Sequence, residues 1–121
     1  MIYNGAHLYL GESVLVGGLG PWRDAIATVE SLEPRHIVCG HQNHQLDDDA
    51  QRTIAETRKY LDDAEQLMET EPTAIDFFNA MVERYPNHIA RTVLWATARS
   101  LYGVRENPDE DVAQLLFAAW Q

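Results

Sequence analysis

The sequence predicts a helix-rich α/β protein with roughly two or three short strands and about five helices. Short apolar or β-branched runs at residues 2–3 and 36–39 are typical of strands. Beyond residue 47, apolar residues recur every three or four positions, as on one face of a helix. With 121 residues, 45% of them hydrophobic, the chain is long enough for one domain with its own core. We expect a single domain over residues 1–121, with a strand–helix–strand portion (1–46) and a helical portion (47–121).

The N-terminal portion contains the predicted strands and one helix. A first short strand is expected near Ile2, and the glycine-rich segment that follows has neither a helical nor an alternating pattern. Pro21 marks the start of a helix, which Pro34 ends. The run 36–39 then predicts a buried strand that leaves the sheet at Gly40. In the helix between Pro21 and Pro34, the apolar residues at helical spacing are Trp22, Ile26, Val29 and Leu32.

Two helices with clear start signals open the helical portion. Asp47–Asp49 supply a cap and negative charge for the first, which runs to about Glu71. Thr73 and Asp76 resemble a capping box for the second, and Pro86 ends it. The expected buried residues are Ile54, Thr57, Leu61, Ala64 and Met68 in the first, and Phe77, Phe78, Met81 and Val82 in the second.

Two further helices complete the helical portion. Asn87 is expected to cap a helix that Gly103 closes in a left-handed turn. A last helix is expected to begin after Pro108. The expected buried residues are Ile89, Val93, Ala96 and Leu101 in the former, and Val112, Leu115, Leu116 and Ala119 in the latter.

Charge and composition narrow the classes of partner. Nineteen acidic against nine basic residues give a formal net charge of -10, which repels nucleic acids and anionic membranes. No segment approaches the ~20 apolar residues of a membrane span, and the N-terminus lacks a signal-peptide pattern. A single cysteine forms no internal disulfide, which suits a reducing compartment. We therefore expect an acidic, cytoplasmic protein without nucleic-acid or membrane partners.

The segment HIVCGHQNHQ, residues 36–45, contains the candidate site residues. Cys39, His41 and His44 are of metal-ligating types and lie close together in the sequence. Their spacing is not that of known zinc modules, so a structural or solvent-facing role for His41 is the alternative. A nucleophilic role for Cys39 is not supported, because the sequence places no activating group within reach of its thiol. The acids at 47–49 are explained by a helix start.

Several segments, taken in order, resemble the C-terminal half of bacterial metallo-β-lactamase-fold hydrolases. They are MIYNGAHLYLGE, PWRDAI, HIVCGHQ, TIAETRKYLDDAEQL, DFFNAMVERYP and LWATARSLYG. The resemblance implies half of an αββα sandwich with a C-terminal helical extension. It also implies that His41, in a Gly-His pair after a strand, matches the last zinc ligand of the family, and that His7 lies near the substrate pocket. For His7, a lone histidine among apolar residues, the favoured alternative is a hydrogen-bonded core or surface residue. The family's histidine-rich H-x-H-x-D-H motif belongs to the N-terminal half and has no counterpart here.

This reading leaves the chain without a complete catalytic centre. Zinc hydrolysis requires about three protein ligands and an open position for water, and one imidazole does not supply them. We assign no catalytic residue, expect no cofactor for the isolated chain, and expect a degenerate, non-catalytic half-domain that acts as an oligomeric scaffold or interaction protein. A homodimer formed through the exposed sheet and apolar helix faces would cover the surfaces that a half-sandwich leaves open.

The alternative function is a zinc-dependent hydrolase of esters, thioesters, lactones or similar bonds, whose site another chain completes. An N-terminal-half partner would then supply the missing ligands, with His41 as a ligand and His7 or His44 nearby. The sequence is also compatible with a fragment of a longer gene product.

Overall fold

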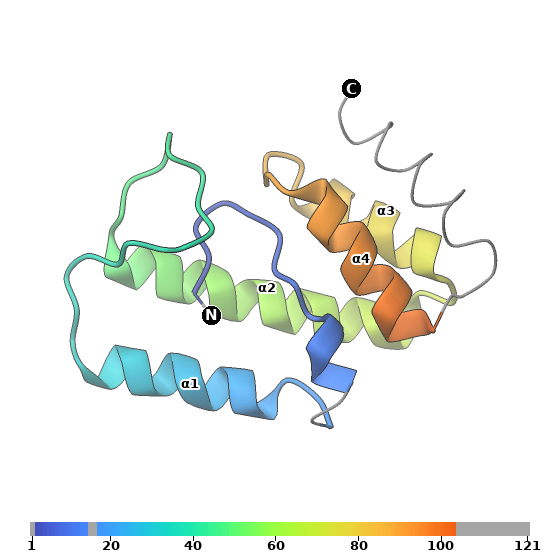
Figure 1. The fold of residues 1–121 in the computed structure, drawn as a ribbon, viewed down its shortest axis with the longest axis horizontal. Coiled ribbons are helices and arrows are strands. Elements are labelled where there is room, and N and C mark those ends of the chain that lie inside the picture. Colours follow the sequence, from blue (N-terminus) through green and yellow to red (C-terminus); the bar gives the residue numbers. More distant parts are fainter. Residues whose placement is uncertain (1, 15–16, 104–121) are drawn as a thin grey trace.

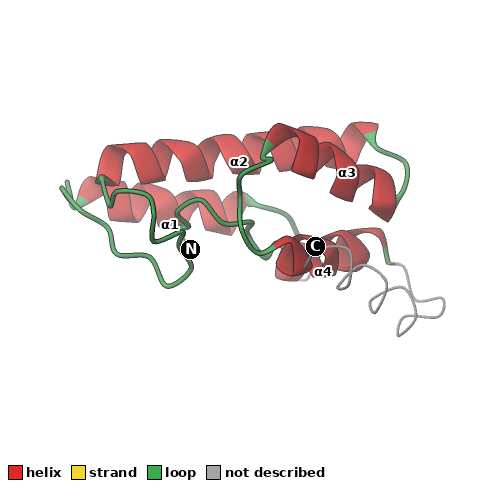
Figure 2. Ribbon diagram, turned by 90° about the horizontal axis from the view of Figure 1, so that it is seen from above, coloured by secondary structure: helices red, strands yellow, loops and turns green. Residues whose placement is uncertain are grey.

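The computed structural model describes residues 2–14 and 17–103, which form a short 3-10 helix and four α-helices. In Figure 1, α1 and α2 lie side by side and run in opposite directions, α3 folds back along α2, and α4 folds back along α3. Figure 2 shows loops and helices but no strand arrows. The elements are η1 (Gly11–Val14), α1 (Gly20–Ser31), α2 (Ala50–Thr70), α3 (Ala74–Arg84) and α4 (Arg91–Tyr102).

The predicted sheet is wrong, and with it the α/β fold class and the half-sandwich that the resemblance implied. The described residues contain isolated bridges only: Asn4 with Gln42, Ala6 with Ile89, and His36 with Asp49. The run at 36–39 is not a buried strand, since the Val38 side chain is 80% exposed. The described part of the chain is therefore helical with long extended connections, and it offers no sheet face for a dimer.

Residues 2–10 form an extended segment that passes through the interior. Its backbone hydrogen bonds are shared between helix side chains and the backbone of the connections near residues 41–43 and at residue 89. The Thr97 hydroxyl accepts from the Leu10 N–H at 3.0 Å and donates to the Leu8 carbonyl at 3.2 Å. On α2, the Thr57 hydroxyl lies 3.3 Å from both the amide nitrogen and the carbonyl oxygen of Tyr3. At Tyr3, Leu8 and Leu10, helix side chains thus take the place of a neighbouring strand, whereas the middle of the segment pairs with the backbone of the connections.

Three of the predicted helices are confirmed with their start signals. Pro21 lies in the first turn of α1, the Asp49 carboxylate accepts from the Arg52 N–H at 2.8 Å, and the Thr73 hydroxyl accepts from the Asp76 N–H at 3.2 Å. The core joins residues from all four helices and from the extended segment. Its most deeply buried members include Leu8, Leu10, Ile26, Leu61, Phe77, Met81 and Leu94.

The helix α4 differs from its prediction in its start and in its buried face. Its N-cap is Ala90, in a left-handed conformation with φ 67° and no side-chain cap, so the expected cap by Asn87 is wrong. Gly103 closes the helix in a left-handed turn as predicted. The buried residues are Leu94, Trp95, Thr97 and Ala98 instead of the predicted set.

Other sequence expectations have mixed outcomes. Leu32 was expected on the buried face of α1, but it lies beyond the end of that helix and is 76% exposed. The helix expected after Pro108 lies outside the described residues. No helix in the described ranges is long and apolar enough to cross a membrane.

We predict that Thr97→Val lowers the free energy of unfolding by about 2–4 kcal/mol, because the Leu10 N–H and the Leu8 carbonyl lose their partner while buried. Urea unfolding followed by circular dichroism measures this. Thr28→Val on the exposed side of α1 is the matched control and should change the value by less than about 0.5 kcal/mol. Equal effects of the two substitutions would contradict the assigned role of Thr97.

Candidate functional site

The loop that carries the predicted metal ligands holds His41 and His44 at the surface. The His41 ring stacks on Tyr3, with ring centroids 5.0 Å apart and planes at 19°. Its carbonyl accepts from the Asn4 N–H at 3.2 Å, which fixes the loop beside the extended segment. The Nδ1 of His44 lies 3.4 Å from Nε2 of Gln42. His41 therefore presents an accessible imidazole with an aromatic support.

Cys39 is buried next to this loop, with 6% of its surface exposed. Burial raises the pKa of its thiol. A raised pKa keeps the sulfur protonated at neutral pH, and the protonated form is a poor nucleophile and a poor metal ligand. The geometry gives Cys39 the role of a small core residue.

The structure places His7 in a different environment from the loop. Its ring contacts are Tyr60 and His88, whereas His41 stacks on Tyr3. Within residues 2–14 and 17–103, no three histidine, cysteine, aspartate or glutamate side chains are grouped so that they could hold a metal ion. These residues alone do not supply the ligand set that zinc hydrolysis requires, and the role of His41 as a ligand stays a prediction.

A buried polar cluster surrounds His7. Its Nδ1 lies 2.9 Å from the Tyr60 hydroxyl, and its Nε2 has no hydrogen-bond partner in the described part of the chain. The Nε2 of His88 pairs with Glu56 Oε1 at 3.1 Å, and the same oxygen accepts from the Gly5 N–H at 3.2 Å. The cluster thus ties the extended segment, α2 and the α3–α4 connection together.

Burial and neighbouring charges set the protonation of this cluster. Desolvation by burial is the largest cause that lowers the pKa of His7 to about 3, and the electrostatic interactions with His88 and Arg91 act in the same direction. The hydrogen bond from His88 lowers the pKa of Glu56, against the opposing effect of burial. Burial raises the pKa of Tyr60. At neutral pH His7 is therefore uncharged and Glu56 is a carboxylate.

The sequence contains a signal for this cluster that the predictions from sequence do not use. Arg52, Glu56 and Tyr60 are spaced four residues apart and share one face of α2. The Arg52 guanidinium donates to Glu56 at 2.7 Å and to the Asn4 side chain at 2.8 Å. Polar residues repeated on the inner face of a long helix indicate a buried hydrogen-bond network.

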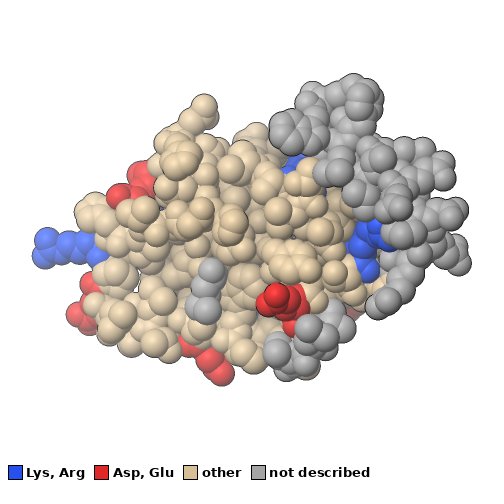
Figure 3. Space-filling model, viewed as in Figure 1, with Lys and Arg blue, Asp and Glu red and all other residues tan. Residues whose placement is uncertain are grey.

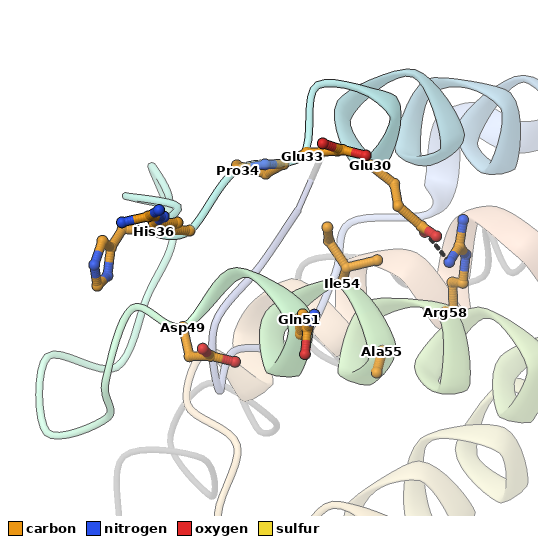
Figure 4. A pocket seen from close by; sticks show the side chains of 10 residues that line it. Glu30, Glu33, Pro34, His36, Asp49, Gln51, Ile54, Ala55 and Arg58 are labelled. Atoms are coloured by element: carbon orange, nitrogen blue, oxygen red, sulfur yellow. Dashed lines mark ion pairs between the residues drawn. The ribbon is translucent and has the colours of Figure 1, made fainter.

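A hollow with a volume of about 920 Å³ lies between the end of α1 and the start of α2. Figure 4 shows Ile54 between the two helices, with the Glu30–Arg58 ion pair at one end and His36 at the other. The other lining residues are Glu33, Pro34, Arg35, Asp49, Gln51 and Ala55.

Two charged residues at the rim of this hollow, Glu33 and Arg35, differ from the neighbouring charged residues in their lack of a pairing partner within the described residues. Glu30 pairs with Arg58, and His36 Nδ1 lies 2.8 Å from Asp48. By contrast, the Glu33 and Arg35 side chains have no hydrogen bond or ion pair with any described residue.

Comparison of the chain with family models, with curated proteins and with solved structures gives no match in any of the three. The resemblance to metallo-β-lactamase-fold hydrolases therefore stays a prediction.

We predict that acid weakens the fold through His7. The unfolded imidazole binds a proton near pH 6.5, whereas the buried one does so only near pH 3, so stability is fully present above pH 6.5 and is lost as the pH falls toward 3. Between pH 7 and pH 5 this residue should lower the free energy of unfolding by about 2 kcal/mol. Urea unfolding at a series of pH values measures how steeply the free energy of unfolding changes with pH.

His7→Gln should remove that part of the pH dependence, because glutamine does not titrate. The exposed variant His44→Gln is the control and should keep the slope of the original chain. An unchanged slope in His7→Gln would show that the His7 imidazole titrates normally in the folded state.

Proposed function

We propose that the chain is an interaction protein that associates with a second copy of itself. The observation that carries the proposal is the exposure of two large apolar side chains, Leu32 at 76% and Val38 at 80%, on either side of the hollow's rim residues. Single exposed apolar residues are common, whereas two at nearly full exposure in one short loop indicate a contact surface.

The charge distribution supports a protein partner. The net charge of -10 disfavours phosphate-rich partners. In Figure 3 the basic side chains of the face shown lie in small separate places, mostly toward its margin, and form no continuous stripe. A cytoplasmic location agrees with the single cysteine and belongs to the same proposal.

The buried polar groups support a binding role over catalysis by this chain alone. Glu56, His88 and Arg52 are engaged with one another, and His7 and Tyr60 lie in the interior. A general acid or base has to contact the substrate. These side chains instead make contacts that stabilise the fold.

We predict that the purified chain sediments as a dimer at roughly tens of micromolar and dissociates on dilution, since an interface of modest area gives micromolar affinity. Analytical ultracentrifugation over a concentration series measures this. A monodisperse monomer across that range would contradict the proposal.

A second candidate function is a share in a zinc-dependent hydrolase whose site another chain completes. The observation that favours it is the exposed His41 ring, whose nitrogens make no hydrogen bond within the described residues. An accessible imidazole held by stacking is available as one ligand to a metal that a partner also binds.

This candidate predicts near-stoichiometric zinc, by elemental analysis, in protein purified without chelator or metal-affinity resin and mixed with its partner chain. His41→Ala should lose the metal because it removes a ligand, while His36→Ala, which alters an exposed histidine paired with Asp48, should retain it. Equal zinc content in the two variants would remove His41 from the metal site.

A further inference from the structure

The 32–38 loop, residues 32–38, connects the end of α1 to the segment that leads to His41. It carries the two most exposed of the large apolar side chains described, Leu32 and Val38. Between them lie Glu33 and Arg35, both of which line the rim of the hollow between α1 and α2. Apolar and charged groups of one short loop therefore face solvent together.

Glu33 occupies a backbone conformation that glycine normally fills. It follows the C-cap residue Leu32 and has a φ of 52°, and its N–H donates to the Glu30 carbonyl at 2.9 Å. A left-handed residue just after a helix is most often glycine, because a Cβ is unfavourable there. A glutamate at this position departs from the local preference for glycine, as Ala90 also does, and such departures are enriched at functional positions.

The charges of the loop complement a second copy of the same loop. Glu33 and Arg35 are opposite in sign, have no partner among the described residues, and are separated only by Pro34, whose ring restricts the backbone between them. In a two-fold contact, a residue that meets another is met by it in return. One acidic and one basic residue on the same loop are therefore able to form two reciprocal ion pairs across a two-fold axis.

Local complementarity is needed because the two copies repel each other at long range. Each chain has a formal net charge of -10. A contact between copies requires apolar burial and paired charges at its centre, and the 32–38 loop offers both.

We propose that the 32–38 loop is the interface of a two-fold dimer, in which Glu33 of each copy pairs with Arg35 of the other and Leu32 and Val38 pack against the facing loop. This inference rests on the proposed self-association and specifies its surface. The dimer covers the rim of the hollow between α1 and α2.

Charge exchange tests the reciprocal pairs. Glu33→Arg alone and Arg35→Glu alone each place like charges opposite one another twice, so each should raise the dimer dissociation constant by about tenfold or more. The double variant Glu33→Arg/Arg35→Glu restores both pairs and should return to within about threefold of the original value. Analytical ultracentrifugation measures all four chains, and an equimolar mixture of the two single variants should form heterodimers.

Two further variants separate loss of the interface from loss of the fold. Glu33→Gly suits the left-handed backbone, so it should raise the melting temperature of the dilute monomer while it weakens the dimer. Val38→Asp should abolish the dimer, whereas Ile75→Asp, on the exposed face of α3, should not.

The outcomes distinguish this inference from the proposed function. In one outcome the original chain dimerises, but the single exchanges leave the dimer equally tight or the double exchange fails to restore it. Either result overturns the interface and leaves self-association standing. A dimer lost in Ile75→Asp and kept in Val38→Asp also overturns the interface. An original chain that is monomeric throughout overturns both.

Discussion

The buried extended segment 2–10 has to pair its backbone polar groups inside the protein, and the rest of the fold depends on how it does so. A buried N–H or carbonyl without a partner costs about as much as a lost hydrogen bond. Leu10 is 1% exposed, yet no strand runs beside it in the described residues, and Thr97 of α4 pairs with its amide. Near the start of the segment, the Thr57 hydroxyl of α2 accepts a hydrogen bond from the Tyr3 N–H. These contacts fix α2 and α4 around the segment.

The polar cluster around His7 follows from the same constraint. Glu56 accepts from the Gly5 N–H, and its pairs with His88 and Arg52 favour the carboxylate and lower its pKa although it is half-buried. His7 stays neutral because burial, together with the neighbouring His88 and Arg91, lowers its pKa. Because these groups are engaged with one another, the contact surface that we propose is the exposed 32–38 loop.

The helices were predictable from the sequence to the extent that their signals are local. The caps of α2 and α3 depend on Asp49 and Thr73, and the structure confirms both. The sheet was not predictable, because short apolar runs do not tell whether another strand or a helix side chain completes their hydrogen bonds. The same limit applies to the site: the pattern at residues 39–44 suggested a metal, whereas the contacts of His7 with His88 join residues far apart in the sequence.

Amide hydrogen exchange at Leu10, followed by nuclear magnetic resonance, tests the central claim most directly, because this N–H has a side-chain hydroxyl as its partner. If Thr97 replaces a neighbouring strand, the Leu10 amide should exchange as slowly as the central amides of α2, by opening of the whole fold. Exchange at the rate of an unstructured peptide would show that the segment is not held in the interior and would contradict the account.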